Sequence, residues 1–224
     1  MLGIKRRWAA KRRCNRSHSM KIAIIGATGN VGTRLVTEAL GRHHAVTAIA
    51  RDASKVPART GLSATTGDAA KPDQLIPLLK GHDAIISSLR FQSPSPTPQQ
   101  LIDLVRRSGV KRYLVVGGAA SLEIAPGQIL LNAPNFPPAY KPEASAGKAF
   151  LDALREVKDL DWTFLSPSAF FGPGERTGKF RLADNTLLTA ADGKSHISYE
   201  DYAIAMLDEI ENPRHIRARF TVGY

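Results

Sequence analysis

The chain has 224 residues, of which 43% are hydrophobic and 23% charged, a composition ordinary for a globular domain with a sizeable core. No stretch approaches the roughly 20 consecutive apolar residues that a membrane-spanning helix requires. Cys14 is the single cysteine, which excludes an internal disulfide and a multi-cysteine metal site and favours a reducing, cytoplasmic location.

The formal net charge of +11 is concentrated at the N-terminus. Residues 1–19 contain seven lysines and arginines and no acidic residue, whereas residues 20–224 carry 24 basic and 20 acidic residues. Because such a run repels itself and has little apolar surface to bury, we expect residues 1–19 to form a basic, disordered extension. A targeting segment and a basic arm that contacts nucleic acid or anionic lipid are the alternatives. For residues 20–224 we expect no nucleic-acid partner.

From Lys21 onward, short β-rich runs alternate with helical patterns, as in stacked βαβ units. Strands are predicted over residues 22–25, 46–50, 62–66, 84–87, 114–116 and 162–165. Helices are predicted over residues 30–40, 72–79, 97–108 and 143–157. The first strand is apolar throughout, which is typical of a parallel strand covered on both faces. This order of elements predicts an α/β fold with a doubly wound parallel sheet.

Loops and a small C-terminal region complete the pattern. Three prolines in residues 91–98 indicate a surface loop, and a second loop rich in Gly, Pro and Asn extends to about Pro142. After residue 165, short strands are predicted over residues 180–182, 187–189 and 217–222, beside a helix over 199–210. Ser198 and Asp201 are spaced as a capping pair for that helix. A region this short predicts only a modest substrate pocket.

The sequence GATGNVG at residues 26–32 follows the first apolar strand and opens an amphipathic helix. In this context Gly26 permits a tight turn, Gly29 lets the backbone approach a pyrophosphate, and Gly32 lets the helix pack closely on the sheet. The N–H groups at the helix N-terminus favour a bound phosphate. Residues 20–224 are therefore predicted to form one Rossmann-type domain that binds NAD(P). The contacts expected from this turn come from Gly26, Ala27, Thr28, Gly29, Asn30 and Val31.

The choice between the two nicotinamide dinucleotides is expected at the end of the second strand. An acidic residue there holds the ribose 2′-hydroxyl of NAD, whereas an arginine accommodates the 2′-phosphate of NADP. The residue at this place is Arg51, which favours NADP(H). Asp52 follows it directly, so NAD(H) stays an alternative.

Further cofactor contacts are predicted at the carboxyl ends of other strands, where open α/β sheets bind their ligands. Asp68 could meet the adenine amino group, and capping a turn is its alternative role. Small residues near the ribose and nicotinamide allow backbone contact, although they equally allow tight packing. The candidates at these strand ends are Gly67, Asp68, Ala69, Ser87, Ser88, Leu89, Gly117, Gly118, Ser166 and Pro167.

With these residues placed, the chain resembles the atypical short-chain dehydrogenases/reductases that bind NAD(P)H, in particular the group named NADH-flavin reductases. Biliverdin reductase B and the NmrA-like proteins look like more distant relatives. The resemblance covers residues 20–224 and rests on six motifs. These are GATGNVG at 26–32, VVGGAASLE at 115–123, DLDWTFLSPS at 159–168, PGERTG at 173–178, ISYEDYA at 197–203 and RFTVGY at 219–224.

Members of the wider family use a Tyr-x-x-x-Lys pair, in which the lysine helps the tyrosine to relay a proton. No tyrosine in this chain is followed by lysine four residues later, so the catalytic acid is unknown. Candidates for it are Ser121, Tyr140 and His196. The pocket serine and histidine of biliverdin reductase B would fall near Gly118 and Ser168, and neither residue matches, which disfavours tetrapyrrole reduction.

Reduction of a ketone requires protonation of a developing alkoxide, whereas a delocalised acceptor can take its proton later from water. We therefore expect an NADPH-dependent reductase of a flavin or another quinone-like acceptor. Glu175 and Arg176 could form a lid pair or an ordinary surface salt bridge. Contacts to the acceptor are expected from Phe91, Ser168, Phe170, Phe171, Glu175 and Arg176.

Two other functions stay open. The first is a non-catalytic, NmrA-like regulator that senses NADP(H), and the second is a sugar-nucleotide epimerase or dehydratase. The histidines have no metal-ligand spacing, so we expect no metal site. The expected partner is a small-molecule acceptor, and the expected oligomeric state is a monomer or a homodimer.

Overall fold

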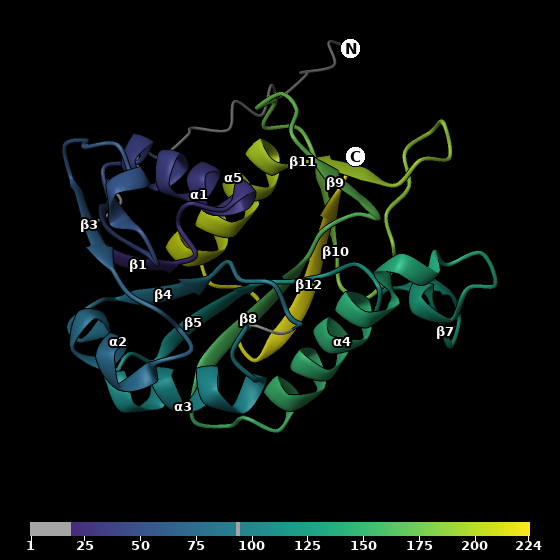
Figure 1. Cartoon of the computed structure of the whole chain (residues 1–224). Helices are drawn as coiled ribbons and strands as arrows, with labels where there is room; N and C mark the ends of the chain where they lie inside the picture. The colour runs from purple at the N-terminus through teal and green to yellow at the C-terminus, as the bar shows by residue number, and fades with distance from the viewer. Residues whose placement is uncertain (1–18, 93–94) are drawn as a thin grey trace, which may run out of the picture.

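The computed structural model describes residues 19–92 and 95–224, so residues 1–18 of the predicted extension lie outside the described part. Its centre is an eight-stranded sheet with the strand order β10-β12-β8-β5-β4-β1-β2-β3 (Figure 1). All neighbouring strands of this sheet run parallel except β10 and β12. The strands are β1 (Lys21–Ile25), β2 (Ala45–Ala50), β3 (Leu62–Thr66), β4 (Ala84–Ser87), β5 (Arg112–Val116), β8 (Asp161–Ser166), β10 (Arg181–Ala183) and β12 (Ala218–Gly223).

Helices cover both faces of the sheet (Figure 1). Helices α1 (Asn30–Gly41) and α5 (Tyr199–Glu211) pack together over one face, and their buried side chains form one half of the core. The other half lies beneath α2 (Pro72–Leu79), α3 (Pro98–Ser108) and α4 (Lys141–Arg155). The predicted α/β fold with a doubly wound sheet is confirmed. The strand order reverses between β1 and β4, which places a ligand-binding crevice at the carboxyl ends of these strands.

Local signals explain where the helices begin. Thr97 caps α3 in a capping box with Gln100, and the Ser198 side chain accepts the Asp201 N–H at the start of α5, as predicted. Helix α4 begins at Lys141, two residues before the predicted start. Pro142 is compatible with that first turn, because its missing N–H would have no helical partner there.

Short elements account for the differences from the predicted pattern. The loop up to Pro142 contains the hairpin strands β6 (Glu123–Ala125) and β7 (Gln128–Ile129) and two turns of 3-10 helix. Strands β9 (Phe170–Gly172) and β11 (His196–Ser198) pair in parallel and were not predicted. The strand predicted over residues 187–189 is wrong, because Leu187 only donates its N–H to the Glu123 carbonyl beside an isolated bridge. The 3-10 turns of the described chain are η1 (Ala53–Lys55), η2 (Leu130–Asn132) and η3 (Pro138–Tyr140).

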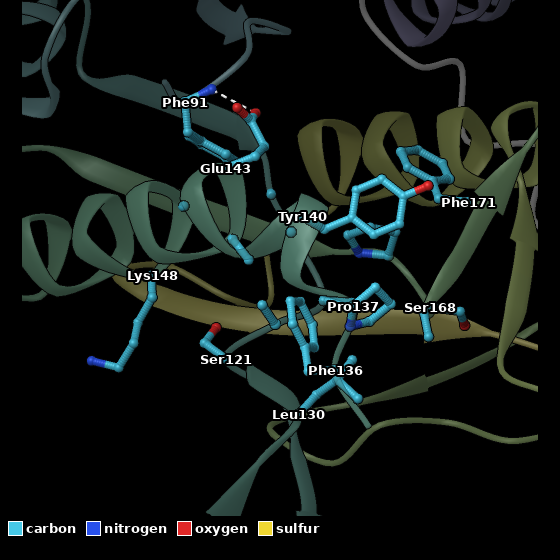
Figure 2. Close-up of a pocket in the computed structure, with 18 of the residues that line it drawn as sticks. Phe91, Ser121, Leu130, Phe136, Pro137, Tyr140, Glu143, Lys148, Ser168 and Phe171 are labelled. Atoms are coloured by element: carbon cyan, nitrogen blue, oxygen red, sulfur yellow. Dashed lines mark hydrogen bonds between the residues drawn. The ribbon is translucent and has the colours of Figure 1, made fainter. Parts of the chain in front are cut away.

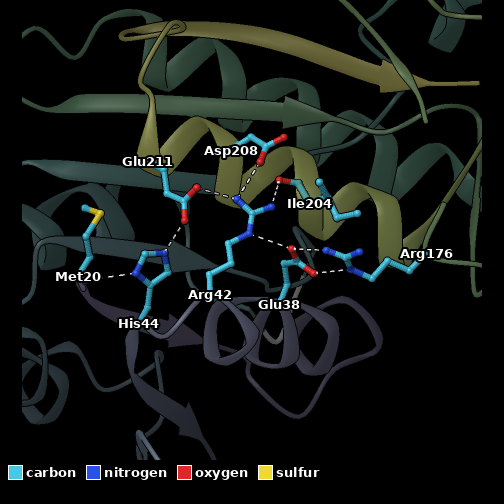
Figure 3. Close-up of polar contacts among 8 residues, drawn as sticks. All are labelled: Met20, Glu38, Arg42, His44, Arg176, Ile204, Asp208 and Glu211. Carbon is cyan, nitrogen blue, oxygen red and sulfur yellow. Dashed lines mark hydrogen bonds and ion pairs between the residues drawn. The ribbon is translucent and has the colours of Figure 1, made fainter. Parts of the chain in front are cut away.

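A set of ion pairs, which we name the α1–α5 network, joins α1 to α5 and to the segment 173–179 (Figure 3). The buried Glu38 carboxylate accepts hydrogen bonds from Arg42 at 2.8 Å and from Arg176 at 2.8 and 3.0 Å. Arg42 also donates to Asp208 and Glu211 at 2.8 and 2.9 Å. Burial alone would raise the pKa of Glu38, but the hydrogen bonds from the two arginines hold this pKa below its ordinary value.

The last residue, Tyr224, is part of the folded body. Its hydroxyl donates to Asp201 at 2.8 Å, and its ring packs on His196 with 4.9 Å between the centroids. Its carbonyl oxygen accepts a hydrogen bond from Arg181 at 2.5 Å. Tyr224 thus ties the C-terminus to the start of α5 and to β10. None of the helices in the described ranges is both long and apolar enough to cross a membrane.

Candidate functional site

Three glycines shape the turn between β1 and α1, and each has a different reason to be glycine. Gly26 has a φ of +83°, and a β-carbon there would collide with the Ser88 carbonyl. A β-carbon at Gly32 would collide with the Gly26 carbonyl. Gly29 has an ordinary φ of −71°, and its β-carbon would meet only the Gly26 carbonyl oxygen, at 3.3 Å. The fold therefore requires Gly26 and Gly32, whereas Gly29 leaves open space above the turn.

This open space faces the N-terminus of α1. Gly29 is the N-cap residue, so no side chain hydrogen-bonds to the first N–H groups of the helix, and its first turn has no acidic residue. These N–H groups have no partner within the helix, and the helix dipole makes them attractive to an anion. A phosphate cradle at Asn30 and Val31 therefore stays a prediction, at a helix N-terminus that has room for an anion.

A groove of about 410 Å³ extends from this turn across the ends of β2 and β3. Arg51 is exposed and lines the groove, whereas Asp52 does not. The Asp52 carboxylate instead caps η1 by accepting the Ser54 N–H at 3.1 Å and the Ser54 hydroxyl at 2.6 Å, and these bonds lower its pKa. Predicted cofactor residues along the groove are Gly26, Thr28, Gly29, Arg51, Gly67, Asp68, Ala69, Ser88 and Leu89.

Three of the strand-end candidates have additional structural roles. Asp68 lines the groove and also accepts the Ala70 N–H at 3.0 Å, so it caps a turn at the same time. A β-carbon at Gly67 would collide with the Leu75 side chain, so this glycine is needed for packing. Ser87 is buried, and its hydroxyl lies 3.0 Å from the Tyr113 hydroxyl. The Ser87 side chain therefore points into the core.

A second and larger space, of about 640 Å³, lies beyond the ends of β5 and β8 (Figure 2). We name it the apolar cavity, because aromatic and aliphatic side chains form most of its wall. Residues 88–92 connect it with the groove, since Leu89 lines the groove and Phe91 lines the cavity. Its wall includes Phe91, Gly117, Gly118, Ala119, Ala120, Ser121, Leu130, Phe136, Pro137, Tyr140, Glu143, Lys148, Pro167, Ser168 and Phe171.

Tyr202 on α5 fixes the backbone beneath this cavity and was not predicted. Its fully buried hydroxyl donates to the Leu165 carbonyl at 2.7 Å and accepts the Gly117 N–H at 3.3 Å. Burial raises the pKa of Tyr202 far above its ordinary value, so the hydroxyl stays protonated and can donate. The position of Tyr202 in the motif ISYEDYA was the available signal. It joins the end of β8 to Gly117, the residue that follows β5.

Several polar groups in the wall of the apolar cavity are already engaged. The Glu143 carboxylate accepts the N–H groups of Phe91 and Gln92 at 2.8 and 3.1 Å (Figure 2). The Lys148 ammonium pairs with Asp152 at 2.6 Å, and the Ser168 hydroxyl donates to the Val222 carbonyl at 3.1 Å. These contacts hold the wall in place and leave Ser121 and Tyr140 as hydroxyl groups to consider for chemistry.

Two of the three candidates for a catalytic acid belong to this wall. Ser121 lines the cavity, and Tyr140 does so with 67% of its surface exposed, so it stands at the rim. His196 lies on β11 outside the wall, with its ring against Tyr224 and no hydrogen-bond partner for its buried Nδ1 among the described residues. The structure thus separates His196 from the other two.

The residues expected to contact an acceptor are divided in the same way. Phe91, Ser168 and Phe171 line the cavity, and the Phe171 ring packs edge-on against Tyr199 at 4.7 Å. Phe170, Glu175 and Arg176 are not part of its wall, and neither is Ser166, which was predicted to contact the cofactor. Phe170 is 69% exposed, and Arg176 pairs with Glu38 of the α1–α5 network, which leaves no lid pair with Glu175.

Known proteins similar to this chain cover almost all of its length. An uncharacterised protein of Bacillus subtilis, YwnB, is 39% identical over 213 residues, which cover 91% of this chain and 98% of that protein. A solved structure from Bacteroides thetaiotaomicron, provisionally named an epimerase, is 41% identical over 92% of this chain and 98% of its own, with a TM-score of 0.87. Another from Streptococcus pneumoniae, provisionally named an NADH-flavin reductase, is 37% identical over 92% of this chain and 99% of its own, with a TM-score of 0.74.

The family model for NAD(P)H-binding proteins matches residues 26–213, from the first glycine of the turn to the segment after α5. The resemblance inferred from the six sequence motifs is thereby confirmed. The chain belongs to the NAD(P)H-binding family of Rossmann-fold proteins.

Proposed function

We propose that the protein is an NADPH-dependent reductase whose acceptor is a flavin or another conjugated, quinone-like ring. The observation that carries the proposal is the placement of the apolar cavity next to the groove above the glycine turn. Both spaces lie at the carboxyl ends of the parallel strands, and residues 88–92 form their common wall. A nucleotide in the groove and a ring in the cavity would thus lie side by side.

The cofactor would be held mainly by the backbone. Gly29 and the first N–H groups of α1 would receive the pyrophosphate, and Arg51 would pair with the 2′-phosphate that distinguishes NADP from NAD. Asp68 would accept a hydrogen bond from the adenine amino group. When bound, NADPH supplies a hydride from its nicotinamide ring. The role of the chain is then to orient the two rings and to exclude water from between them.

The wall of the apolar cavity suits a planar, conjugated acceptor. Phe91, Phe136, Tyr140 and Phe171 offer aromatic surface, which stacks well on another ring. Phe91 is held firmly, because its ring stacks on Phe164 with a centroid distance of 6.1 Å and its N–H donates to a carboxylate. A rigid aromatic wall positions a ring at a low cost in side-chain entropy.

The wall is less suited to the reduction of a simple ketone, because it offers no tyrosine activated by a lysine. Tyr140, at the end of η3, and Ala144 and Lys148 on α4 line the cavity at intervals of one helical turn, but the Lys148 ammonium is paired with Asp152. The lysine is therefore not placed to lower the pKa of a neighbouring tyrosine. Loss of such a general acid slows ketone reduction by roughly 10²–10⁴-fold, whereas a delocalised acceptor tolerates it.

The test is the oxidation of NADPH by purified protein with FMN or a soluble quinone as acceptor, followed under anaerobic conditions. Gly29→Ala should abolish turnover, because its β-carbon fills the space above the turn. The matched control is Gly41→Ala, where a β-carbon meets nothing within 4 Å, and this variant should retain full activity. Tight binding of NADPH without turnover on any such acceptor would instead favour a regulator, and no binding of either nucleotide would reject the proposal.

We place this activity in the cytoplasm, where NADPH is kept reduced and where a chain with one cysteine needs no disulfide. Fractionation of cells that express the full chain tests this, with the protein expected in the fraction that contains cytoplasmic enzymes.

A further inference from the structure

Arg219 is a buried cation beside the apolar cavity. It lies on β12 with 8% of its surface exposed, and its guanidinium contacts only neutral acceptors among the described residues. Nε and one terminal nitrogen donate to the Asn185 side-chain oxygen at 2.9 and 2.7 Å. The other terminal nitrogen donates to the Ser121 hydroxyl oxygen at 3.3 Å. Ser121 in turn lines the cavity (Figure 2).

Burial of an unpaired guanidinium lowers the stability of the folded protein, which suggests that the charge serves a function. A buried guanidinium ordinarily has a carboxylate partner, and Arg219 belongs to none of the ion pairs within the described chain. Burial, and next the charge of Arg155, lower the pKa of Arg219 to about 10, while Glu123 acts in the opposite direction. The guanidinium therefore stays protonated at neutral pH and lacks a neutralising partner.

The contact with Arg219 makes Ser121 an acceptor and leaves its proton to be donated. One of the two lone pairs of the Ser121 oxygen accepts a hydrogen bond from a cation, and its own O–H has no acceptor among the described residues. A hydroxyl that accepts a charge-assisted bond is also a stronger donor, since hydrogen bonds in a chain polarise one another. The side chain of Ser121 lies in the cavity wall, so the available acceptor is a molecule bound there.

We propose that Arg219 and Ser121 form an oxyanion-stabilising pair for the acceptor of the proposed reductase. Ser121 donates a hydrogen bond to a carbonyl oxygen conjugated with the ring, and Arg219 acts as a positioning residue through Ser121. The substrate class is then narrowed to conjugated carbonyl compounds, such as isoalloxazines and quinones. The inference rests on the proposed function for its place in a reaction, but the binding preference it describes can be measured separately.

The charge balance of the reaction explains the need for such a pair. An acceptor that receives a hydride from NADPH gains two electrons and one proton, so it carries one additional negative charge, and NADP⁺ is left. Conjugation places that charge largely on the carbonyl oxygen until a proton from water neutralises it. A preorganised donor that meets the oxygen at this moment lowers the barrier, because its dipole does not have to reorient as the charge develops.

The kinetic test compares two kinds of hydride acceptor. Ser121→Ala should lower kcat with FMN or a quinone by about 100- to 1,000-fold, which is the effect expected for one missing oxyanion donor. It should not slow turnover with phenazine methosulfate, whose ring accepts a hydride without forming an oxygen anion. Arg219→Met should reproduce the effect, and Arg219→Lys should restore part of it. Because the bond strengthens only as charge develops, kcat and kcat/KM should fall together.

The matched control is Arg112→Lys, which alters an equally buried arginine at the amino end of β5, where it pairs with Glu209. This variant should lose stability in thermal unfolding without changing the ratio of the two acceptor rates. A variant of Arg219 that merely weakened the fold would behave like this control. Equal losses with both kinds of acceptor in the Ser121 and Arg219 variants would overturn the proposal.

A second measurement needs no turnover. p-Nitrophenol bound to the protein alone should ionise at a lower pH than free p-nitrophenol, because Ser121 and Arg219 favour the phenolate, and its colour reports this directly. Ser121→Ala and Arg219→Met should remove the shift. If the shift is present but no acceptor is reduced, the proposed function fails and the oxyanion pair stands. If acceptors are reduced but the shift is absent or survives in the variants, the oxyanion pair is wrong.

Discussion

Replacing Glu38 by glutamine removes the charge at the centre of the α1–α5 network and keeps the shape of the side chain. Glu38 is 8% exposed and accepts three hydrogen bonds from Arg42 and Arg176. An amide of the same shape lacks the negative charge that makes these bonds strong. The variant should therefore fold, but with a smaller free energy of unfolding.

The size of the loss follows from the surroundings of each arginine. Arg42 keeps Asp208 and Glu211 as partners, so the cost there is that of one hydrogen bond to a charged group, about 1.5–3 kcal/mol. The Arg176 side chain is 59% exposed and can return to water, so its share is at most about 1 kcal/mol. We expect a total of about 2–4 kcal/mol at pH 7.

Urea unfolding of the two proteins across a range of pH measures this loss. The pKa of Glu38 lies below its ordinary 4.5 in the folded protein, so its stabilising effect is complete above 4.5 and is lost as pH falls through the folded-state pKa. The difference between the wild type and Glu38→Gln should therefore be largest at pH 7 and should shrink below pH 4.5. Asp73→Asn serves as the control. It breaks the ion pair between Arg107 and Asp73, whose side chain is 79% exposed, and should cost less than about 1 kcal/mol.

Two results would refute this reasoning. One is a loss of unfolding free energy for Glu38→Gln that is no greater than the loss for Asp73→Asn. This would mean that burial does not increase the contribution of an ion pair to stability. The other is a loss that persists unchanged in acid, where the Glu38 carboxyl group is protonated and resembles the amide.

Three further outcomes are expected. Arg51→Ala should weaken NADPH binding about 10- to 100-fold in calorimetry and leave NADH almost unaffected, because only the 2′-phosphate pairs with the guanidinium; equal weakening would reject the assignment. Gly29→Ala should cost no more than about 1 kcal/mol of stability and yet abolish nucleotide binding, whereas Gly32→Ala should cost about 3 kcal/mol in chemical unfolding. Tyr202→Phe should cost about 0.5–1.5 kcal/mol, because it removes the hydroxyl's hydrogen bond to the Leu165 carbonyl, which keeps the Gly117 N–H as a donor, and an unchanged melting temperature would contradict the role given to this hydroxyl.

Much of the fold could be predicted because the capping and turn residues mark the same elements as the spacing of the apolar residues. The bounds of β3 and α2 coincide with those expected, α3 begins one residue after the predicted start at Thr97, and α5 begins after Ser198, the capping residue identified in the sequence. Strands β9 and β11 were missed since each has only three residues, too few to show a period. A strand was wrongly expected at residues 187–189, where apolar residues follow one another without a partner strand.

The candidate site could be predicted where it depends on the backbone. The glycine turn, Arg51 and Asp68 lie along one groove, because the ends of consecutive parallel strands meet at one edge of the sheet. Contacts between distant side chains carry no sequence signal of this kind. The pairing of Arg176 with Glu38, the bond from Arg219 to Ser121 and the position of His196 outside the cavity wall all depend on tertiary packing.

The engagement of Tyr224 has a practical consequence for every assay proposed above. A fusion tag placed after this residue would extend the chain from a carbonyl that Arg181 holds and from a ring that rests on His196. Such a tag would strain the start of α5, where Asp201 receives the tyrosine hydroxyl. A handle fused directly after Tyr224 should therefore lower the melting temperature.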